Sequence, residues 1–284
     1  MSGTLTLALA ALALLQQTDT VVPLNGATRL SVDNPGGSIV VVTWDRPAVR
    51  IEAEHSARTF IDIDRRGQTL DVEAEARRGP ATIVDYRITV PASLDLDLEG
   101  MYTTITVTGA DGTVEAETLQ GDIQVRGGRG TLKLSSTNGK IDVEGAEGRI
   151  EIETVGQPVR VANSAGEVLV ESVGGSITME NVRARVVEAG TVGGRIRYSG
   201  TLAPDGRYFF GTHGGPIDIE VPEGTGATFT LATIHGGITA NVAGAPERFA
   251  RGQRHSFTTG GGGAQVEAET FGGRITLARP GGGL

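Results

Sequence analysis

The sequence predicts an all-β protein, a single-stranded parallel β-solenoid in which one chain winds into coils of about 18 residues with two strands each. Three observations predict this fold. A motif of glycine, any residue and an apolar–polar–apolar triplet recurs along the chain, hydroxyl residues recur at twice that spacing, and opposite charges meet at the longer spacing. We expect a right-handed coil, the usual hand of parallel crossovers, and β-strand caps that protect the edges at both ends.

The composition excludes several classes of protein. The chain has 284 residues with 43 glycines, no cysteine and a formal net charge of −9. Glycine at this level without extra proline or a three-residue period excludes collagen. The absence of cysteine excludes disulfides, Fe–S clusters and thiol nucleophiles. An acidic chain without a basic stripe lacks the electrostatic footprint of a nucleic-acid binder.

The amino terminus begins with an apolar run over residues 5–15. This run is shorter than the roughly 20 residues that a membrane-spanning helix needs, and it fits the apolar region of a secretory signal. Residues 1–17 are therefore predicted to be a signal peptide, although no Lys or Arg precedes Arg29; the alternative is an ordinary buried strand or helix. Export would place the protein in the periplasm, on the cell surface or in the medium.

Residues 28–98 are predicted to form the amino-terminal β cap and the first coils. They contain non-repeating segments with the apolar–polar alternation of half-buried strands, namely Ser38–Thr43, Val49–Glu54, Phe60–Asp64, Leu70–Glu75, Ile83–Pro91 and Leu94–Leu98.

Residues 99–246 are predicted to form the parallel solenoid. The motif recurs every nine residues, beginning at Gly112, Gly121, Gly130, Gly139, Gly148, Gln157, Gly166 and Gly175. Hydroxyl residues mark every second unit at Thr118, Ser136, Thr154 and Ser172, and then at Thr191, Thr212 and Thr233. The coil is therefore predicted to hold two nine-residue units.

Charge gives an independent test of the coil length, because residues one coil apart lie about 4.8 Å from each other and like charges there are penalised. At an offset of nine, like pairs outnumber opposite ones between residues 111 and 185, whereas at eighteen only Glu153–Glu171 is alike. The opposite pairs at eighteen are Asp111–Arg129, Glu115–Lys133, Asp122–Lys140, Arg126–Glu144, Arg129–Glu147, Lys133–Glu151, Asp142–Arg160, Arg149–Glu167 and Glu167–Arg185.

The register also predicts the interior and the corners. One side should bury Ile123, Ile141, Val159, Ile177, Ile196 and Ile217, with Val125, Val143, Val161, Met179, Tyr198 and Ile219 beside them. The other should bury Val114, Leu132, Ile150 and Val168, with Ala116, Leu134, Ile152 and Val170. Gly127, Gly145, Asn163, Asn181 and Gly200 recur at one corner, where a left-handed backbone suits Gly and Asn.

Residues 247–278 are predicted to close the solenoid. We expect a carboxy-terminal hairpin around Gly260–Gly263, followed by a last strand over Gly273–Leu277.

Several of these segments together resemble a known family. They are Val32-Asp33-Asn34 with Gly37 and Trp44-Asp45, Val84–Pro91, the repeated triplets, and the closing Glu269–Leu277. Over residues 28–278 the chain resembles the putative-adhesin family of bacterial envelope proteins, a β-solenoid family of undefined biochemical role. The resemblance implies an envelope β-solenoid, and it transfers no catalytic or ligand residues.

The most irregular stretch, residues 201–211, is the best candidate for binding, because irregular loops on regular scaffolds often carry function. Tyr208, Phe209 and Phe210 could form a small recognition patch with His213. The alternative is that alternation buries one or two of these aromatics to fill a wider coil.

His213 and His235 each precede two glycines and could lie on neighbouring coils. Two stacked imidazoles could bind a transition metal, but no third ligand recurs at a matching offset, so ring stacking at a turn is favoured. Calcium is excluded because the turns lack the repeated aspartate of nonapeptide calcium repeats.

The sequence favours an exported, non-catalytic interaction module with no cofactor. Its partner would be an envelope or extracellular glycan or protein, without nucleic acid and without a membrane span. Two alternatives are a self-assembling scaffold, in which coils of different chains stack end to end, and a polysaccharide-active β-helix enzyme, which would need two carboxylates about 5–9.5 Å apart.

Overall fold

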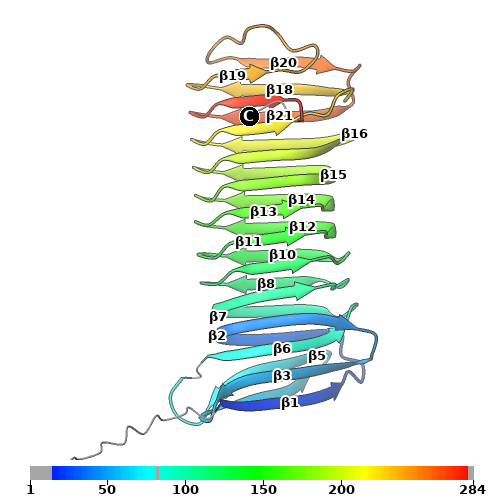
Figure 1. The fold of residues 1–284 in the computed structure, drawn as a ribbon, viewed down its shortest axis with the longest axis vertical. Helices are drawn as coiled ribbons and strands as arrows, with labels where there is room; N and C mark the ends of the chain where they lie inside the picture. The colour runs from blue at the N-terminus through cyan, green and yellow to red at the C-terminus, as the bar shows by residue number, and fades with distance from the viewer. Residues whose placement is uncertain (1–14, 81–82, 281–284) are drawn as a thin grey trace, which may run out of the picture.

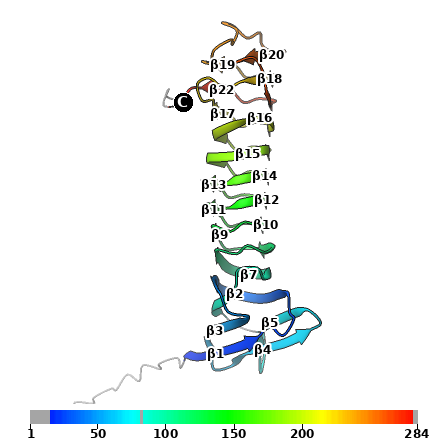
Figure 2. The same cartoon turned by 90° about the vertical axis from the view of Figure 1, so that its right-hand side faces the viewer.

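The computed structural model describes residues 15–80 and 83–280, which contain 22 β-strands and no helix. The strands are stacked along one long axis, with the amino-terminal strands at one end and β18 to β22 at the other (Figures 1 and 2). The predicted signal peptide falls mainly on residues outside the described part. The first described strand, β1 (Leu15–Pro23), was not predicted.

The first of two ladders of paired strands runs the length of the stack. Its strands, in spatial order, are β4 (Thr59–Arg66), β5 (Thr69–Ala76), the start of β2 (Arg29–Trp44), the start of β7 (Asp95–Thr108), β8 (Val114–Thr118), β10 (Thr131–Ser136), β12 (Glu147–Thr154), β14 (Ala165–Ser172), the ends of β15 (Ile177–Thr191) and β16 (Ile196–Thr212), β21 (Ala264–Thr270), β18 (Ala227–Thr233) and β20 (Arg254–Thr259).

The second ladder lies on the other side of the stack. Its strands, in spatial order, are β1, β3 (Ala48–Ser56), β6 (Val84–Pro91), the ends of β2 and β7, β9 (Ile123–Arg126), β11 (Ile141–Glu144), β13 (Val159–Ala162), the starts of β15 and β16, β17 (Ile217–Glu220), β22 (Ile275–Ala278) and β19 (Ile238–Ala240).

The central strands pair in parallel at an offset of eighteen residues, as the repeat predicted. Ile141 lies opposite Ile123, and Asp142 lies opposite Arg160. All of the residues predicted for the interior are buried, and they form one continuous hydrophobic core between the ladders. The alternation of one inward and one outward side chain therefore fixed the register.

Three of the predicted charge pairs form salt bridges across neighbouring strands, with N···O distances of 2.8, 3.2 and 2.9 Å for Glu115–Lys133, Asp142–Arg160 and Arg149–Glu167. The pair Glu167–Arg185 was wrong. The register of β14 and β15 shifts between Gly166 and Glu167, which places Val186 opposite Glu167, and Arg185 instead pairs with Asp205.

The corner residues follow the prediction with one exception. Gly127, Gly145, Asn163 and Asn181 have φ of 67°, 71°, 52° and 53°, and the amide of Asn181 donates to the Asn163 side chain at 2.8 Å. The prediction was wrong for Gly200, which lies inside the long strand β16 without a positive φ.

At the carboxy-terminal end, the strands are not stacked in the order of the sequence. β21 pairs with both β16 and β18, and β22 pairs with both β17 and β19. The later segment 264–278 therefore lies between two earlier ones, visible in Figure 1 as red strands below the orange ones. The expected hairpin around Gly260–Gly263 is replaced by a crossover, because β20 and β21 each pair with β18 rather than with one another.

The amino-terminal end is threaded in a similar way. β2 lies between the layer of β5 and β6 and the layer of β7, although both layers follow it in the sequence. Buried Asn34 holds this corner through two hydrogen bonds. Its side-chain amide donates to the Val84 carbonyl at 2.9 Å, and its backbone carbonyl accepts from Thr103 Oγ1 at 2.8 Å. Antiparallel strands β1 and β4 form the outer edges.

Candidate functional site

Residues 201–211 lie within strand β16, so the irregularity predicted there is narrower than a loop. Leu202 pairs with Ala184 and Arg207 pairs with Val186, so residues 203–206 form a bulge in the strand. Alternation along this strand separates its three adjacent aromatics. Tyr208 and Phe210 point inward and are 2% and 0% exposed, whereas Phe209 points outward and is 37% exposed. Of the three, only Phe209 can contact a partner.

The inward aromatics fill the wide part of the core. The ring of Tyr198 lies 5.9 Å from that of Tyr208 and 5.3 Å from that of Phe210, measured between centroids. The Tyr208 hydroxyl donates to the Ala184 carbonyl at 2.6 Å and accepts from the Ala203 N–H at 2.7 Å. Burial raises the pKa of both tyrosines, because the phenolate would lose its hydration. These side chains therefore stabilise the fold.

His213 and His235 lie at the turn beside Phe209, with Phe271 between them. The His213 and Phe271 rings are stacked with centroids 4.8 Å apart and planes 3° apart, and His235 meets Phe271 edge-on at 4.9 Å. Backbone hydrogen bonds also place the turn of Phe271 between the other two turns: Gly272 N–H donates to His213 O, and His235 N–H donates to Phe271 O, each at 2.9 Å.

The ring stack changes what the two histidines can do. Because Phe271 separates them, the imidazoles do not converge on a shared metal, and the described residues contain no group of three potential metal ligands. The alternative interpretation, ring stacking at a turn, is the one observed, with a phenyl ring as the middle member.

A shallow groove of about 540 Å³ lies next to this ring stack, on the outer face of β16, β21 and β18. Phe209, Ile234 and Phe271 supply exposed apolar surface. Arg254 supplies polar groups at the edge, where its guanidinium forms ion pairs with Glu267 and, at 3.2 Å, with Glu269. Apolar surface with a few convergent polar groups is the usual composition of a binding site.

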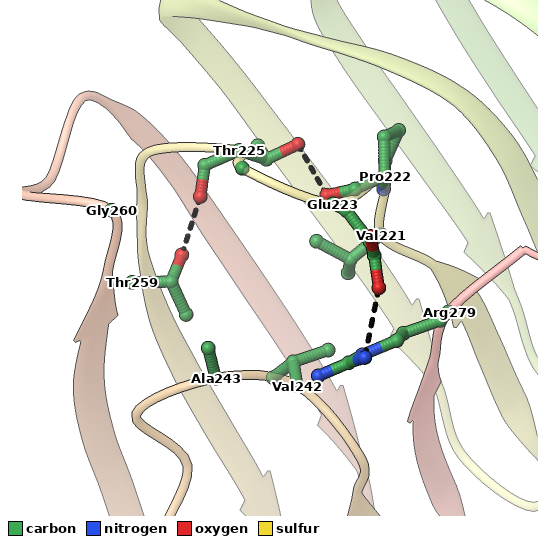
Figure 3. Close-up of a pocket in the computed structure, with 10 residues that line it drawn as sticks. Val221, Pro222, Glu223, Thr225, Val242, Ala243, Thr259, Gly260 and Arg279 are labelled. Carbon is green, nitrogen blue, oxygen red and sulfur yellow. Dashed lines mark hydrogen bonds and ion pairs between the residues drawn. The ribbon is translucent and has the colours of Figure 1, made fainter.

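A second hollow of about 290 Å³ lies at the opposite edge of the same end, near Val221, Pro222 and Val242 (Figure 3). Arg279 donates to Glu223 across its opening at 2.8 Å. Its two threonine hydroxyls, Thr225 and Thr259, donate to backbone carbonyls at 2.8 Å and are already satisfied. The groove at Phe209 is therefore the better candidate.

Phe271, Ile234 and Arg254 were not among the predicted site residues. Phe271 and Ile234 each follow an inward threonine, Thr270 and Thr233, at the position that faces outward at the turn. Thr270 pairs with Thr212 and Thr233, so it joins the column of recurring hydroxyl residues, here called the hydroxyl ladder, although the sequence repeat did not include it. The position after the threonine could have singled out Phe271 and Ile234, but their juxtaposition depends on β21 lying between β16 and β18.

The described part of the chain thus belongs to the class of all-β proteins built from stacked, mainly parallel strands, with an open groove near one end. It contains no helix of the length and apolarity needed to span a membrane. No protein-family model and no curated protein sequence matches the chain.

Three solved structures are similar to the chain at low identity. A putative cell adhesion protein from Clostridium sporogenes is 10% identical over 93% of this chain and 99% of its own, with a TM-score of 0.25. A putative adhesin from Bacteroides fragilis is 15% identical over 92% and 97%, with a TM-score of 0.39. A putative lipid binding protein from Parabacteroides distasonis is 11% identical over 93% and 97%, with a TM-score of 0.43. At TM-scores below 0.5 these likenesses carry no conclusion about this chain.

Proposed function

We propose that this protein is an exported, non-catalytic parallel β-solenoid that acts as an adhesin-like interaction module of the cell envelope. The observation that carries the proposal is the groove at Phe209, because it places three exposed apolar side chains on a scaffold of hydrogen-bonded strands. The ligand would be an extracellular or envelope glycan or protein.

The groove suits binding through flat apolar contacts. Phe209 and Phe271 offer exposed apolar ring atoms to the apolar side of a sugar or to a side chain, and the Arg254–Glu269 pair offers a donor and an acceptor at the edge. Catalytic groups characteristically have perturbed pKa values and face a cleft, whereas the tyrosines with raised pKa, Tyr86 and Tyr198, lie in the closed core and do not line the Phe209 groove. This placement supports a binding role over the enzyme alternative.

Self-assembly by end-to-end stacking is less well supported. Antiparallel strands β1, β4 and β20 lie at three of the four ladder ends, and they interrupt the parallel register that a second chain would have to continue. The fourth end is β19, a strand of three residues that pairs in parallel with β22. Concentration-dependent light scattering or filaments would instead favour the scaffold.

The test is binding of the purified protein to an array of glycans and envelope components. We expect Phe209→Ala with Phe271→Ala to abolish the binding of the best ligand, because the variant removes the exposed apolar surface of both rings. Phe60→Ala is the matched control, since Phe60 is also 37% exposed but lies on β4 at the other end. Equal binding by the double variant would overturn the groove as the site, and turnover of a glycan would overturn the non-catalytic role.

A further inference from the structure

A stripe of exposed apolar side chains runs along the corner where the first ladder turns into the second. Its members, here called the apolar corner, are Met101, Leu119, Val155, Val173 and Val192, each between 48% and 54% exposed. Thr137 occupies the one intervening layer. Turn-to-turn backbone bonds hold the layers in register, among them Leu119 N–H to Gly100 O and Val173 N–H to Thr154 O, each at 3.1 Å.

A column of carboxylates follows the same corner on the outer face of the first ladder. Its members, here called the acidic column, are Asp33, Glu99, Glu117, Glu153 and Glu171, all exposed. Strand pairing places Asp33 opposite Glu99, Glu99 opposite Glu117, and Glu153 opposite Glu171. Within residues 15–80 and 83–280, none of the five takes part in a salt bridge.

The acidic column is costly to the fold. Like charges directly opposite each other in a sheet are destabilising, and the neighbouring column avoids this cost with Arg29 and Lys133, which pair with Glu115. The pKa of Glu99 is raised, first by partial burial and then by Asp97, Asp33 and Glu117. A departure from the charge pairing used elsewhere in a fold is expected where function requires it.

The two columns are joined by the strand pattern. Glu117 and Leu119, Glu153 and Val155, and Glu171 and Val173 are each separated by one inward hydroxyl residue, so acid and apolar side chains both face outward side by side. Two shallow hollows, of about 370 and 260 Å³, lie along this surface and share Glu99 and Glu117. The larger is lined by six carboxylates and one lysine, a net charge of 1 − 6 = −5.

We propose that this surface docks a basic amphipathic helix of a partner protein, which lies along the stack with its apolar stripe on the apolar corner and its Lys or Arg residues on the acidic column. Charge complementarity selects a basic partner. Spacing selects a helix, because one helical turn rises about 5.4 Å, close to the roughly 4.8 Å between layers. Alternate residues of a strand are about 6.6 Å apart and do not match.

The dimensions set the length of the partner segment. Five layer spacings separate Met101 from Val192, or about 24 Å at 4.8 Å each, which corresponds to about 16 helical residues. The surface lies on β7 to β15, and its last member, Val192, is one layer from His213, whose N–H donates to Val192 O at 3.2 Å at the edge of the Phe209 groove. Leu119, Val173 and the acidic column lie on earlier layers. This inference is independent of the groove proposed above, and variants at either surface test one without the other.

The test is fluorescence anisotropy with a labelled peptide of Leu, Lys and Ala, about 16 residues long, in which Leu forms one helical stripe and Lys flanks it. We expect saturable binding that weakens as salt is raised, because the contacts include exposed charges. Glu99→Gln with Glu117→Gln and Glu153→Gln should weaken binding about tenfold, and Leu119→Ser with Val173→Ser should weaken it at least as much.

The controls distinguish binding at this surface from non-specific attraction of the peptide to an acidic protein and from non-specific hydrophobic binding. Asp111→Asn with Glu144→Gln and Glu147→Gln removes three exposed carboxylates outside the acidic column and should leave binding unchanged. A scrambled peptide without an apolar stripe, and a peptide with Glu in place of Lys, should bind at least about tenfold more weakly.

Three outcomes would overturn the proposal. The first is unchanged peptide binding by the acidic-column variant, and the second is equal binding of the scrambled peptide. The third is that phosphatidylcholine vesicles bind the wild type, and that Leu119→Ser with Val173→Ser abolishes this vesicle binding but leaves peptide binding intact. The last outcome would mean that the stripe meets lipid. Circular dichroism and a thermal melt of each variant show whether it is folded, and the acidic-column variant should melt no lower than the wild type because it removes repulsion.

Discussion

At the scale of single residues, outward side chains decide how the surface responds to pH. Glu99 and Glu115 lie on adjacent layers with opposite surroundings: Glu99 is flanked by acids, and Glu115 accepts a hydrogen bond from Lys133 at 2.8 Å. The pKa of Glu99 is raised by burial and by those acids, and the pKa of Glu115 is lowered by Lys133. The two carboxylates should therefore contribute to stability with opposite sign.

We expect Glu99→Gln to raise the free energy of unfolding at pH 7 by about 0.5 kcal/mol, because ionised Glu99 is repelled by its neighbours. The gain should vanish as the pH falls through the raised pKa, where Glu99 itself becomes protonated. Glu115→Gln should lower stability at pH 7, since the contribution of a carboxyl with a lowered pKa is present above the ordinary pKa and is lost as the pH falls through the lowered value. Urea unfolding at pH 7 and below the carboxyl range measures both; a loss of stability in Glu99→Gln at pH 7 would contradict the assignment.

At the scale of the element, each turn at the apolar corner is fastened by its hydroxyl. In most layers this hydroxyl donates to a backbone carbonyl of a neighbouring layer and accepts the N–H of the glycine three residues on; Thr191, for example, donates to Gly175 O and accepts from Gly194 N–H, each at 3.2 Å. Thr154 departs from the pattern. Three residues after it stands Gln157 in place of the glycine, and the buried hydroxyl of Thr154 has no hydrogen-bond partner. The hydroxyl ladder is thus a structural repeat in which one member, Thr154, makes no hydrogen bond through its side chain.

This difference supplies a matched pair of variants. Thr191→Val should lower the free energy of unfolding by about 1–3 kcal/mol, because it leaves the buried Gly194 N–H without an acceptor. Thr154→Val should be neutral or slightly stabilising, because it removes a polar atom that has no partner. Chemical denaturation of both variants measures the difference, and equal losses would show that the hydroxyl bonds do not fasten the turns.

The strands were predictable where the pattern is local. The outward charges of Asp142 and Arg160 and the inward Ile123 and Ile141 fixed the eighteen-residue register, because a slip of one residue would expose the core. The order of strands at the ends was not predictable, since Thr233 and Thr270 carry the same local motif and only long-range pairing decides which lies nearer β16.

The candidate site was likewise predictable from the sequence only where it depends on local alternation. Alternation placed either one or two of the aromatics at 208–210 inside the core, and the two turn histidines were expected near one another. Phe271 between them was not foreseen, because its place depends on the strand order and not on any residue nearby in the sequence.

At the scale of the whole molecule, stability passes from layer to layer, and the segment 264–278 connects the last layers to the rest. β18 and β19 pair with β21 and β22 but not with β16 or β17. Removing the inserted segment would therefore separate the outermost layer from its support.

We expect a chain that ends at Gly263 to lose hydrogen-exchange protection over residues 227–240, although it keeps those residues, while β8 to β14 stay protected. In this chain β18 would keep only its antiparallel partner β20 and β19 would have no partner, so both would be detached from the stack and local unfolding would follow. Hydrogen exchange followed by mass spectrometry measures this by segment. Full protection of residues 227–240 would mean that the layers can pair again in the order of the sequence.

The threading of β21 and β22 also bears on when the native state can form. During synthesis, residues 227–240 leave the ribosome before residues 264–278, yet the later segment must enter between the earlier one and the body of the stack. This end of the stack cannot form in the order of synthesis, because its native pairing requires that residues 264–278 have been made. Such a delay leaves one end of the polypeptide without its native strand pairing for longer.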